Sequence, residues 1–129
     1  MEQVRANPTI LCVDDDRNNL QLLHTTLKNY GYNVLEAPTG RYGLGLASAF
    51  LPKAIILDIH MPHMNGIEFI KQLRSSPITQ YIPIIMLTAD ASYDAREACI
   101  AYGCDAYLTI PFDIHQLRDV LRHFTAARA

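Results

Sequence analysis

The sequence predicts an α/β fold in which five parallel strands alternate with five helices. Short apolar runs recur roughly every 25 residues, and each is followed by a segment whose apolar side chains have helical spacing. Five such units within 129 residues fit one domain. Alternation of this kind requires right-handed crossovers between parallel strands, so we expect a three-layer sandwich with helices on both faces of the sheet.

The predicted strands are short apolar runs that read as strands buried on both faces. In residues 54–57 four apolar residues run straight into Asp58, and Pro62 cannot continue a central ladder, so this strand must stop near Asp58 or Ile59. The run at residues 33–37 is weaker and is expected at an edge of the sheet. The other predicted strands cover residues 9–13, 83–88 and 105–110.

The predicted helices combine apolar residues three and four positions apart with polar residues that can cap a first turn. They run from a cap at Asp16 or Asn18 to Gly31, from Thr39 or Gly40 to Phe50, from Asn65 to Ser75, from about Ser92 to Tyr102, and from Asp113 to Phe124. Phe50, Tyr102 and Ile114 are assigned to inward faces. Apart from Tyr102, the inward residues of the helix at 92–102 are small, so it is expected to be less firmly anchored than the last helix.

Composition excludes several classes of function. A net charge of −2 without a basic stripe argues against direct nucleic-acid binding. No apolar run approaches the ~18 residues of a membrane span, and residues 1–8 lack the apolar core of a signal peptide, so we expect a cytoplasmic protein without a membrane segment. Cys12, Cys99 and Cys104 lack CxxC spacing and are expected to be reduced, mostly buried thiols.

Polar side chains follow three of the predicted strands. Asp14 and Asp15 end the first, Asp58 the third and Thr88 the fourth. The carboxyl ends of parallel strands meet at one edge of the sheet, so the three carboxylates could lie close together if the first and third strands are neighbours. Their mutual repulsion then calls for a cation, and oxygen ligands suit Mg²⁺ or Mn²⁺. A carboxylate beside such a metal can attack phosphorus. Asp16 is interpreted as a helix cap.

The chain resembles the receiver domain of bacterial two-component response regulators, which has a flavodoxin-like fold. The likeness extends from about Thr9 to Phe124, so residues 1–129 are expected to form a single receiver domain. An ordered set of motifs carries it: Val13-Asp14-Asp15, Leu57-Asp58-Ile59-His60-Met61-Pro62, Asn65-Gly66, Leu87-Thr88-Ala89 and Pro111-Phe112.

The resemblance implies that Asp58 accepts a phosphoryl group from a phosphohistidine, supplied by a histidine kinase or a phosphotransfer protein of a phosphorelay. It implies that Asp14 and Asp15 serve the metal, with Asp15 the more direct ligand. Asp58 and the backbone carbonyl of His60 would complete the protein ligands.

The resemblance also implies a switch. Thr88 would hydrogen-bond the phosphoryl group and move toward it, and Tyr107 would rotate inward behind it. The face made by helix 92–102, strand 105–110 and the last helix would carry the signal to a downstream protein or an attached output domain. The same face is where any weak homodimer is expected. Such a domain is no enzyme beyond its own phosphorylation and slow dephosphorylation.

An enzyme of the aspartyl-nucleophile type, a phosphatase or mutase, is a poorer interpretation. That chemistry usually requires a second acid two residues after the nucleophile, where this chain has His60. A flavin carrier would need a phosphate-binding loop after the first strand, where Asp14, Asp15 and Asp16 would repel a phosphate.

Ile110 departs from the family pattern, which places a lysine immediately before the proline that follows the fifth strand. An isoleucine can neither pair with Asp58 nor contact a phosphoryl oxygen. Two hypotheses follow. In the favoured one, Asp58 is still phosphorylated because the metal does most of the electrostatic work. In the other, the domain is a pseudo-receiver that binds proteins independently of phosphorylation.

Overall fold

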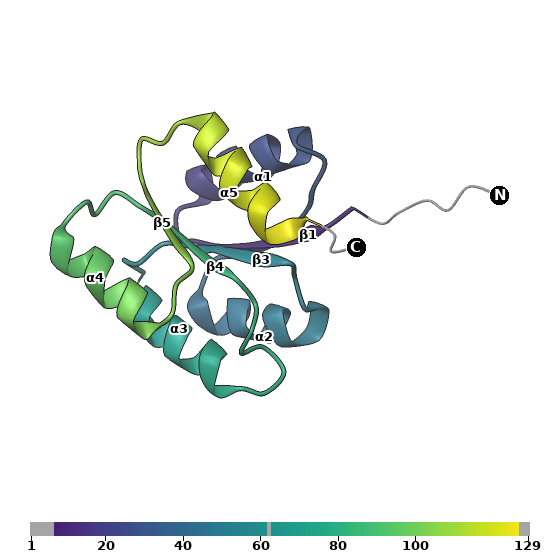
Figure 1. The fold of residues 1–129 in the computed structure, drawn as a ribbon. Coiled ribbons are helices and arrows are strands. Elements are labelled where there is room, and N and C mark those ends of the chain that lie inside the picture. The colour runs from purple at the N-terminus through teal and green to yellow at the C-terminus, as the bar shows by residue number, and fades with distance from the viewer. Residues whose placement is uncertain (1–6, 62, 127–129) are drawn as a thin grey trace.

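The computed structural model describes residues 7–61 and 63–126, which form five strands and five helices in strict alternation (Figure 1). The strands are β1 (Thr9–Val13), β2 (Asn33–Ala37), β3 (Ala54–Leu57), β4 (Ile84–Thr88) and β5 (Ala106–Thr109). The helices are α1 (Arg17–Asn29), α2 (Gly40–Phe50), α3 (Gly66–Ser75), α4 (Tyr93–Tyr102) and α5 (Ile114–Thr125).

The five strands form one parallel sheet in the order β2-β1-β3-β4-β5. Helices α1 and α5 cover one face, and α2, α3 and α4 cover the other (Figure 1). The predicted fold class and the edge position of residues 33–37 are therefore confirmed. Pro62, which was expected to limit β3, lies outside the described residues.

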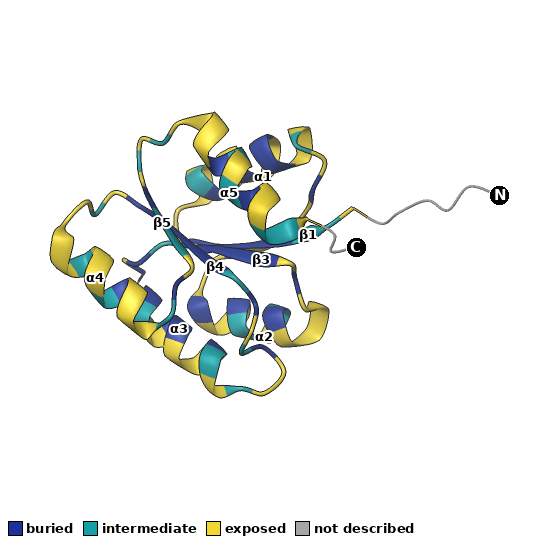
Figure 2. Cartoon of the chain, viewed as in Figure 1, coloured by how far each residue is buried: buried dark blue, intermediate teal, exposed yellow. Residues whose placement is uncertain are grey.

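Side chains alternate between two apolar cores, one on each face of the sheet. Leu11 and Val13 of β1 belong to the core beneath α2, α3 and α4, while Ile10 and Cys12 belong to the core beneath α1 and α5. Strands β3 and β4 are buried along their whole length (Figure 2). Strands that face helices on both sides carry apolar residues at every position, which explains their unbroken apolar runs.

Each helix begins with a polar side chain that accepts a backbone N–H of the first turn. The caps are Asp16, Thr39, Asn65, Ser92 and Asp113. Of the two candidates for α1, the structure selects Asp16, which accepts from the amides of Asn18 and Asn19.

Three residues predicted to point inward are exposed. Phe50 is 61% exposed, Tyr102 is 45% exposed and Ile114 is 50% exposed. Phe50 and Tyr102 are the last residues of α2 and α4, and Ile114 is the first residue of α5. At these helix ends the apolar stripe extends past the strands that it would cover, so periodicity alone assigned them wrongly.

The three cysteines are free and buried, as expected. Burial raises the pKa of the Cys99 thiol to about 11 and that of Cys104 to about 12, so both stay protonated. Among the residues that the structure describes, no helix combines the length and apolar character that crossing a bilayer requires.

Two glycines give a test of how tightly the chain is packed behind Asp58. A Cβ on Gly66 would lie 2.8 Å from Ile59 Cα and 3.1 Å from the Asp58 carbonyl oxygen, whereas a Cβ on Gly45 would meet nothing within 4 Å. We therefore expect Gly66→Ala to lower the free energy of unfolding by about 1–3 kcal/mol. Gly45→Ala, in the middle of an exposed helix face, should raise it by about 0.5–1 kcal/mol. Urea denaturation followed by circular dichroism measures both, and equal effects of the two substitutions would contradict the prediction.

Candidate functional site

Strands β1 and β3 are direct neighbours, which brings Asp14 and Asp58 to adjacent strand ends. The strand register pairs Val13 with Leu57, and each aspartate follows one of these residues. The Asp58 amide continues the ladder with a 3.3 Å hydrogen bond to the Val13 carbonyl, and the Asp14 amide donates to the Ala37 carbonyl at 3.1 Å. The expected proximity of the first and third strands is confirmed.

Asp14 is a buried carboxylate with only 5% of its surface exposed. One of its oxygens accepts the Asp16 amide at 2.9 Å, and the other accepts Asn19 Nδ2 at 3.3 Å. Burial raises the pKa of Asp14 to about 6, and the negative charges of Asp58 and Asp15 add to this rise. A cation near Asp14 would relieve both effects.

Asp58 is half-buried and has one oxygen already engaged. Its Oδ1 accepts the His60 amide at 3.1 Å, and no described residue donates a hydrogen bond to Oδ2. Oδ2 is therefore the oxygen available to an incoming group.

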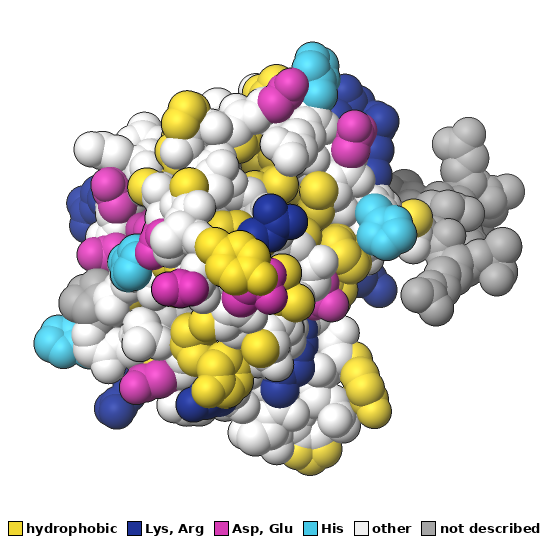
Figure 3. All heavy atoms as spheres, turned by 60° about the vertical axis from the view of Figure 1, so that its left-hand side comes forward, with side chains coloured by type: hydrophobic (Ala, Val, Ile, Leu, Met, Phe, Trp, Pro, Cys, Tyr) yellow, Lys and Arg dark blue, Asp and Glu magenta, His cyan; other side chains and the backbone are white. Residues whose placement is uncertain are grey.

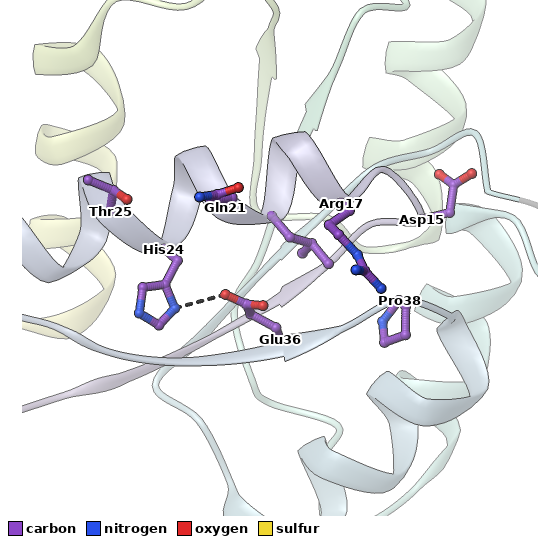
Figure 4. A pocket seen from close by; sticks show the side chains of 8 residues that line it. Asp15, Arg17, Gln21, His24, Thr25, Glu36 and Pro38 are labelled. Carbon is purple, nitrogen blue, oxygen red and sulfur yellow. Dashed lines mark ion pairs between the residues drawn. The ribbon is translucent and has the colours of Figure 1, made fainter.

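Asp15 is exposed and projects from the loop after β1, away from the Glu36–His24 ion pair (Figure 4). Across the described ranges, no three His, Cys, Asp or Glu side chains gather closely enough to form a ready metal cage. The predicted cluster of three carboxylates is therefore a neighbouring pair, Asp14 and Asp58, with Asp15 on the exposed loop after β1.

The loops after β3 and β4 are joined across the site by an ion pair. His60 Nε2 lies 2.7 Å from Asp90 Oδ2, and the Ser92 amide donates to Asp90 Oδ1 at 2.9 Å. Hydrogen bonds from Ser92 and His60 hold the pKa of Asp90 down at about 2. Sequence reasoning missed this contact, because the two residues are 30 positions apart. The available signal was their placement, each two residues after a predicted site residue.

Thr88 and Tyr107 both contact the same loop. Thr88 is buried at the end of β4, and its Oγ1 accepts the Asp90 amide at 3.3 Å. The Tyr107 ring packs against the core beneath α2, α3 and α4, and its hydroxyl donates to the Asp90 carbonyl. Burial raises the pKa of Tyr107 to about 12, so the hydroxyl remains a donor.

Ile110 faces the acidic site, at the position that the resemblance assigns to a lysine. A small cavity of about 40 Å³ is lined by Asp14 and Asp58 on one side and by apolar residues, including Ile110 and Phe112, on the other. Within residues 7–61 and 63–126, no lysine or arginine lines this cavity. Ile110, which replaces the lysine of the family pattern, therefore leaves Asp14 and Asp58 with an apolar neighbour where a cation was expected.

A second, larger hollow of about 650 Å³ lies between α1 and β2 (Figure 4). Of its described lining residues, Asp15 alone also belongs to the acidic site, and a 2.8 Å ion pair joins His24 Nδ1 to Glu36 Oε1 across it. Figure 3 brings forward the side of α4 and β5, where hydrophobic side chains gather in more than one place with acidic side chains between them.

Comparison with known proteins identifies the class of this chain. A model of the response regulator receiver domain family matches residues 10–122, and the chain belongs to that family. It is a receiver domain of two-component signal transduction, in agreement with the resemblance seen in its motifs.

Relatives place the same domain in different contexts. The chain is 36% identical to an uncharacterized 14.6 kDa protein of Leptolyngbya boryana, over 97% of this chain and 95% of that protein. It is 40% identical to response regulator MprA of Mycolicibacterium vanbaalenii, over 90% of this chain and 51% of the relative. The chain therefore spans about half the length of the MprA regulators that it matches.

A solved structure shows the same architecture. The receiver domain of sensor histidine kinase PA1611 from Pseudomonas aeruginosa superposes with a TM-score of 0.87 at 29% identity, covering 95% of this chain and all of that one. That structure is described with a magnesium ion coordinated in its active-site cleft.

The raised pKa of Asp14 predicts an unusual dependence of stability on pH. Between the ordinary value of 3.8 and about 6, the folded protein binds more protons at Asp14 than the unfolded chain does. The contribution of Asp14 to the free energy of unfolding should therefore fall by about 3 kcal/mol as pH rises through this window, and about 2 kcal/mol of this fall should lie between pH 4.5 and pH 7. Urea denaturation in EDTA at pH 4.5 and pH 7 measures this, because Asp14→Asn should remove that part of the pH dependence. Parallel pH profiles of the two proteins would contradict the assignment.

Proposed function

We propose that this receiver domain is a phosphoacceptor and that Asp58 is its nucleophile. The observation that carries the proposal is the Asp58 carboxylate at the end of β3, with one oxygen held by the His60 amide and the other available. Oδ2 of Asp58 attacks the phosphorus of a phosphohistidine on a histidine kinase or phosphotransfer protein. The P–O bond forms as the P–N bond breaks, and the imidazole nitrogen leaves with the electron pair.

Asp14, Asp15, Asp58 and the backbone carbonyl of His60 would hold Mg²⁺ or Mn²⁺ at this site. A bound divalent cation supplies positive charge that offsets the carboxylates and the phosphoryl oxygens. The buried Asp14, whose pKa is raised, supports this assignment, because no described lysine or arginine lines the cavity beside it.

Thr88 would donate a hydrogen bond to a phosphoryl oxygen. Its Oγ1 accepts from the Asp90 amide, which leaves its proton free to donate. Movement of Thr88 would reach Tyr107 through the loop that both contact. The face of α4, β5 and α5 then carries the signal to a downstream protein or output domain. The domain acts as a switch rather than as an enzyme. Its free thiols fit the reducing cytoplasm.

Acetyl phosphate provides the direct test of Asp58. With Mg²⁺, the wild-type protein should gain the mass of one phosphoryl group by intact mass spectrometry, and EDTA should prevent the gain. Asp58→Asn should gain nothing. Asp16→Asn is the matched control, because asparagine caps a helix as well as aspartate does, and it should be modified like the wild type. If the wild-type protein gains no mass although it binds metal, the phosphorylation-independent pseudo-receiver is the better account.

Ile110→Lys tests whether the missing cation beside Asp14 and Asp58 limits the rate of phosphorylation. A lysine ammonium reaching Asp58 and the phosphoryl group would add a charge-assisted contact of ~1.5–3 kcal/mol, which corresponds to a rate of phosphorylation roughly 10–100-fold higher. The reaction should also require less Mg²⁺. Initial rates with acetyl phosphate across a Mg²⁺ titration measure both effects. Ile110→Met, an unbranched side chain without charge, is the control, and equal rates for the two variants would contradict an electrostatic role.

A further inference from the structure

One guanidinium holds the carboxyl-terminal end of α4 in place. Arg74, in the last turn of α3, donates to the Gly103 carbonyl from Nη2 at 2.8 Å and from Nε at 3.3 Å. Its Nη1 donates to the Gln80 carbonyl at 2.9 Å and to the Ile82 carbonyl at 2.7 Å, in the connection between α3 and β4. Arginine stays protonated and presents its donors as a rigid fork, so these contacts persist at all physiological pH values.

The same guanidinium also binds the start of β5. Arg74 Nη2 lies 2.9 Å from Asp105 Oδ2, and that oxygen accepts the Ile84 amide at 2.8 Å. Nearby, Lys71 Nζ lies 4.5 Å from the centre of the Tyr102 ring. Residues 102–105, which end α4 and lead into β5, are therefore joined to α3 and to the start of β4.

The amino-terminal end of α4 is held quite differently. Tyr93, its first residue, is 74% exposed, and Cys99 is the only buried residue in the helix. The loop before Tyr93 is held through Asp90, whose carbonyl accepts the Tyr107 hydroxyl and whose carboxylate pairs with the exposed His60. These contacts belong to the acceptor site, so a change at that site alters them first.

We infer that α4 is a lever anchored by Arg74 and moved from its amino-terminal end. A phosphoryl group at the acceptor site rearranges the contacts of Asp90, residues 90–97 shift, and residues 99–105 remain in place. Figure 1 shows the required arrangement, with α4 starting beyond the strand ends and running back to α3. This inference rests on the proposed function, and it adds which part of α4 reports the phosphoryl group.

The exposed apolar residues of α4 fall into two groups according to the end of the helix on which they lie. Tyr93 lies on the moving end, whereas Ile100 and Tyr102, which are 49% and 45% exposed, lie on the anchored end. A partner that distinguishes the two states of the domain must therefore contact the first turn of α4. Arg74 touches neither the acceptor nor the incoming group, so it acts as a positioning residue.

Hydrogen exchange measured by mass spectrometry tests the lever, with beryllofluoride and Mg²⁺ in place of the phosphoryl group. In the wild-type protein, the exchange of amides in residues 90–97 should change about tenfold, while that of residues 99–105 should stay within about twofold. In Arg74→Gln the change should spread into residues 99–105. Lys71→Ala, on the same helix and against the same end of α4, is the matched control and should keep the change confined.

Equal changes in both segments of the wild type would overturn the inference, and so would a confined change in Arg74→Gln. If Arg74→Gln does not fold, Arg74→Lys replaces it. That variant keeps the charge without the fork and should give the same spread at smaller amplitude.

Failure of the proposed function gives a different result. If native mass spectrometry shows no Mg²⁺-dependent binding of beryllofluoride, the acceptor chemistry is at fault. In that case, hydrogen exchange of the protein without beryllofluoride and Mg²⁺ tests whether Arg74 anchors α4. The amides of Gly103 and Cys104 should exchange about tenfold more slowly than those of residues 95–97, and the Arg74 variant should abolish that difference. A uniform rate along α4 would refute the anchor.

Discussion

The repulsion between Asp14 and Asp58 is the constraint on which this site depends. Neighbouring strands end at these two residues, so the fold itself forces the two carboxylates together at a partly apolar edge. Burial raises the pKa of Asp14 to about 6, and the charge of the neighbouring Asp58 adds to the rise. The described donors to the two carboxylates are neutral: the Asp16 amide and the Asn19 side chain at Asp14, and the His60 amide at Asp58. They orient the carboxylates without cancelling their charge, so the site favours whatever positive charge is supplied from outside.

Ile110 makes the site more dependent on positive charge supplied from outside. A lysine at that position would have brought a fixed cation to the site, but Ile110 and Phe112 wall the cavity with hydrocarbon instead. An apolar wall lowers the local dielectric, which strengthens both the repulsion between the carboxylates and their attraction to a divalent cation. Relative to a receiver with the lysine, a bound divalent cation would therefore carry a larger share of the neutralisation here.

The sequence predicts well the features that follow from one segment at a time. Unbroken apolar runs correctly indicated β3 and β4, since such runs are needed where both faces of a strand are covered. Periodicity failed at Phe50, Tyr102 and Ile114, because it cannot say where a helix extends past its sheet. It also could not reveal the role of Arg74. The acceptors of Arg74 are mostly backbone carbonyls, and a backbone carbonyl leaves no signature in the sequence.

The two ends of α4 differ in how their contacts respond to the site. At the Arg74 end, one partly buried side chain binds carbonyls from two separate connections, and breaking these bonds would leave several polar groups unpaired at once. At the Asp90 end, the partner His60 is exposed, so water can replace its contact at little cost. Small inward residues such as Ala95 add few dispersion contacts that would resist a shift. A perturbation at Asp58 or Thr88 therefore meets least resistance through Asp90, and α4 converts it into a change at the surface around Tyr93.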